Sequence, residues 1–226
     1  MRHLFTIGVI VAGLCAGMGR HAAAADEFLG ATMSEPRSAI AVKWRAIQSQ
    51  MNDDAAQLAA CRADTEACST EDKRFDTIID AARMREGMAR IGEINRTVNL
   101  TIRPMSDMRR FGMRDHWSTP LETLQAGVGD CEDYAILKYL ALREAGFAED
   151  DLQFLIVRDS MLQADHAVVA VRHEGHWIVL DNRTLVLADL QSTLQFKRYR
   201  VLVQLGREID APDYAGLMPL SLAASM

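Results

Sequence analysis

The sequence has little basic charge, and this shortage limits the partners that the protein can bind. It contains 25 Lys and Arg residues against 31 Asp and Glu residues. Nucleic-acid binding needs a basic surface that neutralises phosphates, and this balance does not provide one. The sequence also lacks internal repeats and low-complexity tracts, and 49% of its residues are hydrophobic, which is enough for a full core. We therefore expect a globular domain of ordinary size and no nucleic-acid partner.

The apolar run at the start of the sequence is short. It covers residues 4–14, roughly half of the ~20 residues that a membrane span needs. Arg2 precedes it, and four alanines ending at Ala25 follow it, as at a secretory cleavage site. The pattern predicts a signal peptide over residues 1–25 and a periplasmic or secreted mature protein over residues 26–226. Cleavage would leave 23 basic and 31 acidic residues, which is a formal charge of −8.

Cysteines are few, and their spacing separates them. Cys15 falls within the predicted signal peptide. Cys61 and Cys68 are seven positions apart in a polar segment, so in an oxidising compartment we expect a disulfide, with two free thiols as the alternative. No second Cys or His pair at ligand spacing accompanies them, which argues against a zinc site. Cys131 is left over, and an unpaired thiol in an exported protein indicates a reactive role.

Cys131 lies where a glycine-containing turn gives way to a helical pattern that runs to Gly146. Asp130 is suited to the N-cap, and Asp133 falls at the third helical position, where a carboxylate can reach back to the cap. The helix start lowers the pKa of a thiol, which favours the thiolate. The neighbouring carboxylates, including Glu132, act in the opposite direction. We predict that Cys131 is a nucleophile whose acidic neighbours require a neutralising charge.

The first half of the chain has helical periodicity. Helices are expected over residues 34–60, over 70–99 with interruptions near Gly87 and Gly92, over 121–125 after a capping signal, and over 134–145. Asn95 and Asn99 would share one helix face, as a polar edge or a C-cap. His116 lies in an irregular stretch beside a tryptophan, where a packed or surface histidine is more common than a catalytic one.

The second half reads as strands. They are expected over residues 152–157, 166–172, 176–180 and 199–205, with a hairpin turn at Glu174-Gly175. The sum is an α+β fold, with a helical lobe over about residues 34–146 and a sheet lobe over about residues 152–206.

The hairpin permits a geometric test for a catalytic pair. If the turn is centred on Glu174-Gly175, then Val168 faces Asp181, and His166 lies on the same sheet face as Asp181. The two would be diagonal neighbours roughly 7 Å apart at Cα, within reach through their side chains. Alone, either residue would be taken as structural. Together they offer an imidazole with an orienting carboxylate, which thiol acyl-transfer chemistry at Cys131 requires.

Several segments then resemble one family, the bacterial transglutaminase-like cysteine proteinases. They are Trp117–Leu124, Gly129–Ala135, Leu142-Arg143, His166–Val168 and Leu180–Asn182. The resemblance implies a papain-like fold in which a helical lobe packs on an antiparallel sheet. It also implies Cys131 as the nucleophile, His166 as general base and acid, and Asp181 as the residue that orients the histidine.

The sequence is also similar to the periplasmic calcium-dependent proteases that cut biofilm adhesins. This similarity implies Ca²⁺ held by Asp130 and Glu132, a cell-surface adhesin as the protein substrate, and an inner-membrane regulatory receptor as a partner. A helix start with acidic caps and no metal is the alternative. Two other functions remain open: a transglutaminase with the same triad, and a non-catalytic periplasmic interaction module.

Overall fold

The computed structural model describes residues 35–206, with side chains from residue 39 onward. The predicted signal peptide over residues 1–25, Cys15 and the tail after Pro212 lie outside the described residues. No helix in the described range is long and apolar enough to cross a membrane.

Helices dominate the first half of the described chain. They are α2 (Glu35–Ala63), α3 (Thr70–Arg83), α4 (Gly87–Thr101), α5 (Asp107–Phe111), α6 (Pro120–Ala126) and α7 (Cys131–Glu144), with 3-10 turns at Thr65–Ala67 and Glu149–Asp151. The ends follow the predicted chemistry at α6, where Thr119 and Glu122 form a capping box and Gly127 ends the helix in the left-handed region.

Two expectations about these helices were wrong. The predicted interruption at Gly92 does not occur, because Gly92 lies inside α4, and a single glycine costs a helix only about 1 kcal/mol. The stretch between Pro104 and Pro120 was expected to be irregular, but it contains the short helix α5. The other predicted break, near Gly87, is real and separates α3 from α4.

The second half forms an antiparallel sheet of five strands. They are β3 (Leu152–Asp159), β4 (Ala164–His173), β5 (His176–Leu180), β6 (Ala188–Asp189) and β7 (Tyr199–Leu205), in the order β6-β5-β4-β3-β7, with α8 (Leu190–Gln195) between the last two in sequence. His173 pairs with His176, and Val169 pairs with Leu180, so the predicted hairpin register is confirmed. The α+β layout is confirmed as well.

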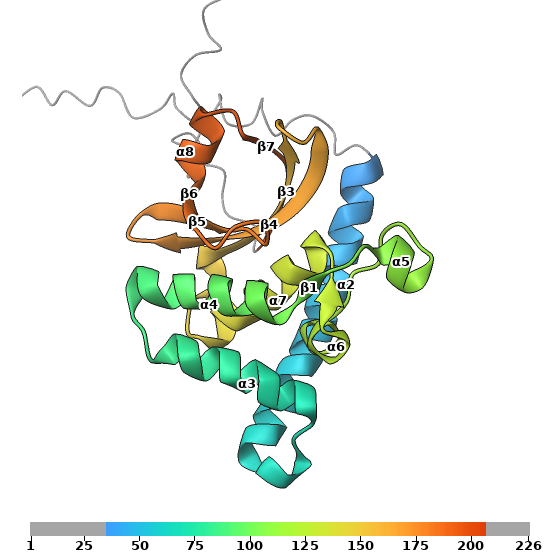
Figure 1. Cartoon of the computed structure of the whole chain (residues 1–226), viewed down its shortest axis with the longest axis vertical. Coiled ribbons are helices and arrows are strands. Elements are labelled where there is room, and N and C mark those ends of the chain that lie inside the picture. Colours follow the sequence, from blue (N-terminus) through green and yellow to red (C-terminus); the bar gives the residue numbers. More distant parts are fainter. Residues whose placement is uncertain (1–34, 207–226) are drawn as a thin grey trace, which may run out of the picture. The chain divides into compact units, whose positions relative to one another are not determined.

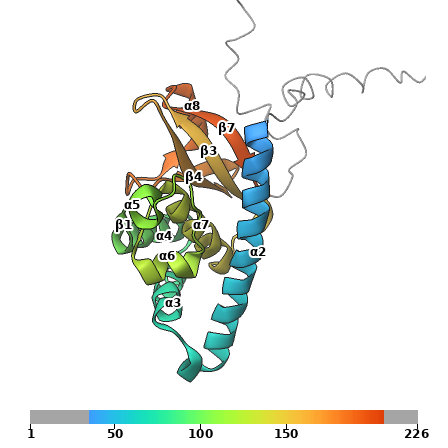
Figure 2. The ribbon, with the colours of Figure 1, turned by 90° about the vertical axis from the view of Figure 1, so that its right-hand side faces the viewer.

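The helix α7 joins the two halves of the fold. Figure 1 shows β3 and β4 on one side of α7 and helices α3 and α4 on the other, and α7 contacts all four elements. Every residue from Asp133 to Leu142 is buried. Figure 2 shows the long helix α2 running beside both parts, where it contacts β7, α3 and α6. The start of α7 is therefore held between a helical layer and the sheet.

Each face of the sheet has its own core. The larger core contains Phe154 and Val169 of the sheet together with Leu137 of α7. The smaller core lies on the opposite face and includes Val168 and Tyr199. Because side chains alternate along β4, His166 belongs to the same face as Val168.

A disulfide joins Cys61, near the end of α2, to Cys68, which precedes α3, with their Cα atoms 4.7 Å apart. Beside it, Arg62 pairs with Asp76 of α3 and with Glu144 at the end of α7. The disulfide thus closes the connection between α2 and α3, as the cysteine spacing predicts.

Candidate active site

Cys131 is the first residue of α7, and it is the cysteine without a disulfide in the described part of the chain. Asp130 takes the N-cap position, but its side chain makes no capping hydrogen bond. The Cys131 thiol donates to Glu132 Oε2 over 2.9 Å. Burial raises the pKa of Cys131, and Glu132 raises it further, while a hydrogen bond from the Ala167 backbone lowers it. The thiol form is therefore favoured in this arrangement.

His166 and Asp181 meet where β4 begins and β5 ends. His166 Nε2 lies 2.8 Å from Asp181 Oδ1, and the two residues are 1% and 4% exposed. The other ring nitrogen of His166, Nδ1, is buried and has no hydrogen-bond partner. The Ala167 amide that contacts the Cys131 sulfur follows His166 directly. The thiol therefore contacts Ala167, the residue after the histidine, and Nδ1 of the histidine makes no hydrogen bond.

Asp181 is fixed by donors from three directions. Besides His166, the Tyr199 hydroxyl donates to Oδ2 and the Arg183 backbone N–H donates to Oδ1 over 2.9 Å. Burial alone would raise the pKa of Asp181, but the hydrogen bonds from His166, Tyr199 and Arg183 outweigh it and hold the pKa below its ordinary value. Asp181 is therefore ionised, which suits a carboxylate that orients an imidazole.

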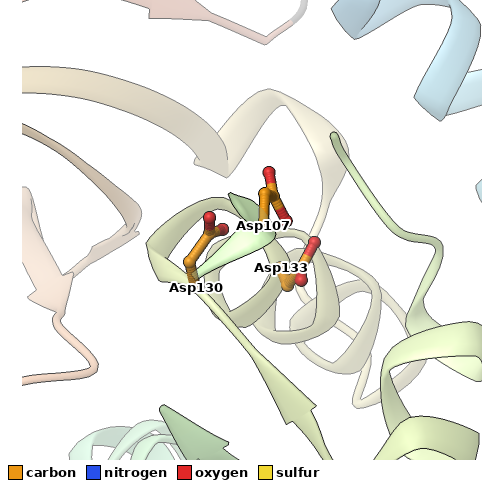
Figure 3. A group of neighbouring side chains, drawn as sticks. All are labelled: Asp107, Asp130 and Asp133. Atoms are coloured by element: carbon orange, nitrogen blue, oxygen red, sulfur yellow. The ribbon is translucent and has the colours of Figure 1, made fainter. Parts of the chain in front are cut away.

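A second group of acidic side chains lies beside the thiol. Asp107, Asp130 and Asp133 each place one carboxylate oxygen within 4.8 Å of the others, and Figure 3 shows the three side chains together. Burial, then the charge of Glu132, raises the pKa of Asp130 to about 8. Burial also raises the pKa of Asp133 to about 7, although the Ser118 backbone N–H opposes this shift. We call these three residues the aspartate cluster.

Backbone pairing brings Asp107 into the aspartate cluster. The strand β1 (Arg103–Pro104) pairs in parallel with β2 (Val128–Gly129), and the Met105 N–H donates to Gly129 O over 2.8 Å. The α5 helix therefore starts beside the start of α7. This pairing could not be predicted from the sequence, because each strand is only two residues long.

The aspartate cluster fits a hard cation. Asp107 Oδ1, Asp130 Oδ1 and Asp133 Oδ2 are all buried without a hydrogen-bond partner, and carboxylate oxygens are the ligands that Ca²⁺ prefers. Arg110 Nη1, 3.7 Å from Asp133 Oδ2, supplies part of the missing positive charge. Glu132, predicted as a second ligand, contacts the thiol and also acts on Asp130 electrostatically.

Comparison with known proteins identifies the family. The family model of the bacterial transglutaminase-like cysteine proteinases matches residues 48–201 of the chain. The chain belongs to this family. It is therefore a transglutaminase-like cysteine peptidase with the α+β, papain-like fold that the sequence predicts. No curated protein sequence matches the chain significantly.

Solved structures of LapG from Legionella pneumophila resemble this peptidase. The calcium-bound form has a TM-score of 0.56 at 20% identity and covers 67% of this chain and 85% of its own. A second LapG structure gives 0.53 at 22% identity, with 66% and 85% covered. An EGTA-treated form gives 0.52 at 22% identity, with 61% and 75% covered. At these identities the likeness shows a shared fold.

Some residues of the peptidase site could not be predicted from the sequence. Tyr199 was expected only as a strand residue, although it contacts Asp181. Asp107 had no motif to mark it. His116 stays outside the triad geometry: its backbone N–H donates to Asp107, and its ring packs 4.1 Å from that of Phe111.

Proposed function

We propose that this peptidase hydrolyses a protein substrate in the bacterial envelope through a triad of Cys131, His166 and Asp181. The observation that carries the proposal is the buried contact of 2.8 Å between His166 and Asp181, next to the backbone amide that meets the Cys131 sulfur. A nucleophile at a helix start and a base on a neighbouring strand, held by a buried carboxylate, form the constellation of a thiol hydrolase.

In the first half of the reaction, His166 takes the thiol proton and the Cys131 sulfur attacks the carbonyl carbon of the scissile peptide. The carbonyl electron pair moves to oxygen. When it returns, the carbon–nitrogen bond breaks, and the leaving amine takes the proton from His166. A thioester on Cys131 remains.

In the second half, His166 removes a proton from water, which attacks the thioester, and the thiol leaves with that proton as the carboxylic acid is released. Because Asp181 is bonded to Nε2 of His166, Nδ1 is the ring nitrogen that exchanges protons with the sulfur and the amine. The backbone N–H of Cys131, at the start of α7, donates to the oxygen that carries the transient negative charge.

We further propose that calcium supports this site. Asp107, Asp130 and Asp133 would hold the ion, because their buried oxygens without hydrogen-bond partners require a positive charge. The bound ion would supply positive charge that offsets the carboxylates beside the Cys131 thiol. The calcium-bound LapG structure supports this assignment, since the two proteins share a fold.

The proposed place of action and substrate rest on the sequence and its resemblances. The predicted signal peptide supports a periplasmic or secreted enzyme, and the oxidised Cys61–Cys68 pair agrees with an oxidising compartment. The resemblance to adhesin-cleaving proteases supports a large cell-surface adhesin as the substrate and an inner-membrane receptor as the regulator.

The test compares envelope fractions of cells that carry the wild-type protein or Cys131→Ala, by sequencing new protein N-termini. We expect wild-type-specific N-termini, including one within a surface adhesin, and their loss in the variant. Equal N-termini in both strains would overturn the peptidase assignment. A purified enzyme that consumes an amine acceptor instead of releasing a free acid would identify acyl transfer, and new N-termini in other proteins alone would reject the adhesin.

A further inference from the structure

Lys138 is a fully buried amine on α7, the helix that begins at Cys131. It lies on α7, seven residues after Cys131, and has 0% exposure. Its Nζ donates to Asn95 Oδ1 of α4 over 2.8 Å. The bonding partner is thus a neutral amide. A lysine buried without a bonded carboxylate is uncommon, because its charge loses hydration without full compensation.

Asn95 and Asn99 in turn form hydrogen bonds to the turn that follows β5. Asn95 Nδ2 donates to Thr184 O over 3.1 Å. Asn99 Nδ2 lies 2.8 Å from Asp181 O and 2.9 Å from Thr184 O, so it holds both ends of the turn. Through its Oδ1, Asn95 also accepts from Asn99 over 3.5 Å. The turn from Asp181 to Thr184 is therefore held on α4 by two amides. Asn99 bonds to both of its ends, and Asn95, which Lys138 contacts, bonds to Thr184.

Geometry explains why a donor is needed at Lys138. An amide side chain can turn over and exchange its oxygen with its nitrogen, and its bonding partners decide which way it points. In its protonated form Lys138 has donors only, so the ammonium group requires the Asn95 oxygen to face α7. The Asn95 nitrogen then faces Thr184. Lys138 therefore adds to Thr184 O and Asn99 Nδ2, which favour the same orientation of the Asn95 amide.

Stability does not account for this lysine. Burial lowers the pKa of Lys138 to about 7, opposed by the charge of Asp181, and the Tyr134 ring, 5.9 Å away, faces it from the same helix. A buried amine usually costs more free energy than an apolar side chain of similar length would. Its placement is better explained by the Asn95 amide that it orients.

We propose that Lys138 is a positioning residue that, through Asn95 and Asn99, holds the turn carrying Asp181 in the geometry that orients His166. The inference rests on the proposed triad. It adds a function for three residues that do not touch the substrate.

The test is a double-mutant cycle on the full-length enzyme, with Lys138→Met and Asp181→Asn. The assay uses the protein substrate or a synthetic peptide that contains its cleavage site. Lys138→Met should lower kcat about tenfold at unchanged KM, the rate effect expected from the loss of one charge-assisted hydrogen bond. In the Asp181→Asn background it should cause no further loss, because its effect passes through Asp181. Thr97→Ala is the matched control, since the Thr97 hydroxyl on α4 donates to Glu93, away from the turn, and the variant should keep wild-type kcat.

The outcomes separate the inference from the triad. Wild-type kcat in Lys138→Met, or a loss that adds fully to that of Asp181→Asn, would overturn the positioning role and leave the triad intact. Wild-type kcat in Asp181→Asn would overturn the triad and the inference together. If Lys138→Met does not fold, Asn99→Ala, which removes the contact to Asp181 O from a half-buried position, takes its place in the same cycle with the same expectations.

Discussion

Removal of calcium should destabilise this peptidase more at high pH than at low pH. The cause is the aspartate cluster, in which Asp130 has its pKa raised to about 8 and Asp133 to about 7. A group whose folded-state pKa is raised adds stability below its unfolded pKa of 3.8, and that stability is lost as the pH rises through the folded value. The calcium-free protein should therefore lose stability between about pH 4 and pH 8.

Calcium at the proposed site would act in the opposite direction, because it would bind the carboxylates in their ionised form and displace their protons. At a free calcium concentration of 100 times Kd, binding would stabilise the fold by about 2.7 kcal/mol. For a domain of this size, each kcal/mol shifts Tm by roughly 2–4 °C, so the expected shift is about 5–11 °C near pH 8. Near pH 5, where protons compete, the shift should be much smaller.

Thermal unfolding followed by circular dichroism, with calcium or with EGTA, measures this difference at both pH values. Asp130→Asn is the control: it removes one of the two titrating groups and one proposed ligand, and it should make the calcium effect small at both pH values. A wild-type Tm that is the same in calcium and EGTA at pH 8 would refute the metal site. An equal shift at both pH values would refute the electrostatic account of it.

Further predictions concern the supports of the site. A methyl group at Gly129 would lie 2.7 Å from Asp133 Cβ. Gly129→Ala should therefore lower the free energy of unfolding, measured in urea, by about 1–3 kcal/mol and abolish the calcium effect on Tm. An unchanged calcium effect would contradict the proposed ligand set. Tyr199→Phe should lower kcat about tenfold because Asp181 loses a donor, and wild-type kinetics would show that the hydroxyl does not act there. Replacement of both disulfide cysteines by serine, across a separation of seven residues, should lower the free energy of unfolding by about 2 kcal/mol at unchanged kcat; a fall in kcat would link the disulfide to the site.

The proposed triad was accessible from the sequence because its parts have local signals. Cys131 stands out as the cysteine left without a partner at a capped helix start. His166 and Asp181 are joined by a short hairpin, and register in a hairpin follows from the turn alone. The His166–Asp181 contact of 2.8 Å thus agrees with a prediction that needed no knowledge of distant contacts.

The aspartate cluster and the Lys138 network depend on contacts that leave no local pattern. Asp107 reaches Asp130 through a parallel pairing of two-residue strands, too short for any periodicity to mark. Lys138 occupies a buried face of α7, where a pattern of apolar residues predicts a solvent-exposed side chain for any lysine. Its partner Asn95 lies 43 residues earlier, on another helix. Tertiary packing alone brings these side chains together.

The position of β7 at the end of the described chain has a consequence for biogenesis. Among the described strands it is the last to be synthesised, yet it pairs with β3 along the sheet and carries the hydroxyl that bonds Asp181. Until Tyr199 has left the ribosome, β3 has an open edge and Asp181 lacks one of its donors. We therefore expect a polypeptide that ends before Tyr199 to carry the Cys131 thiol without the full set of donors to Asp181, and to have little peptidase activity.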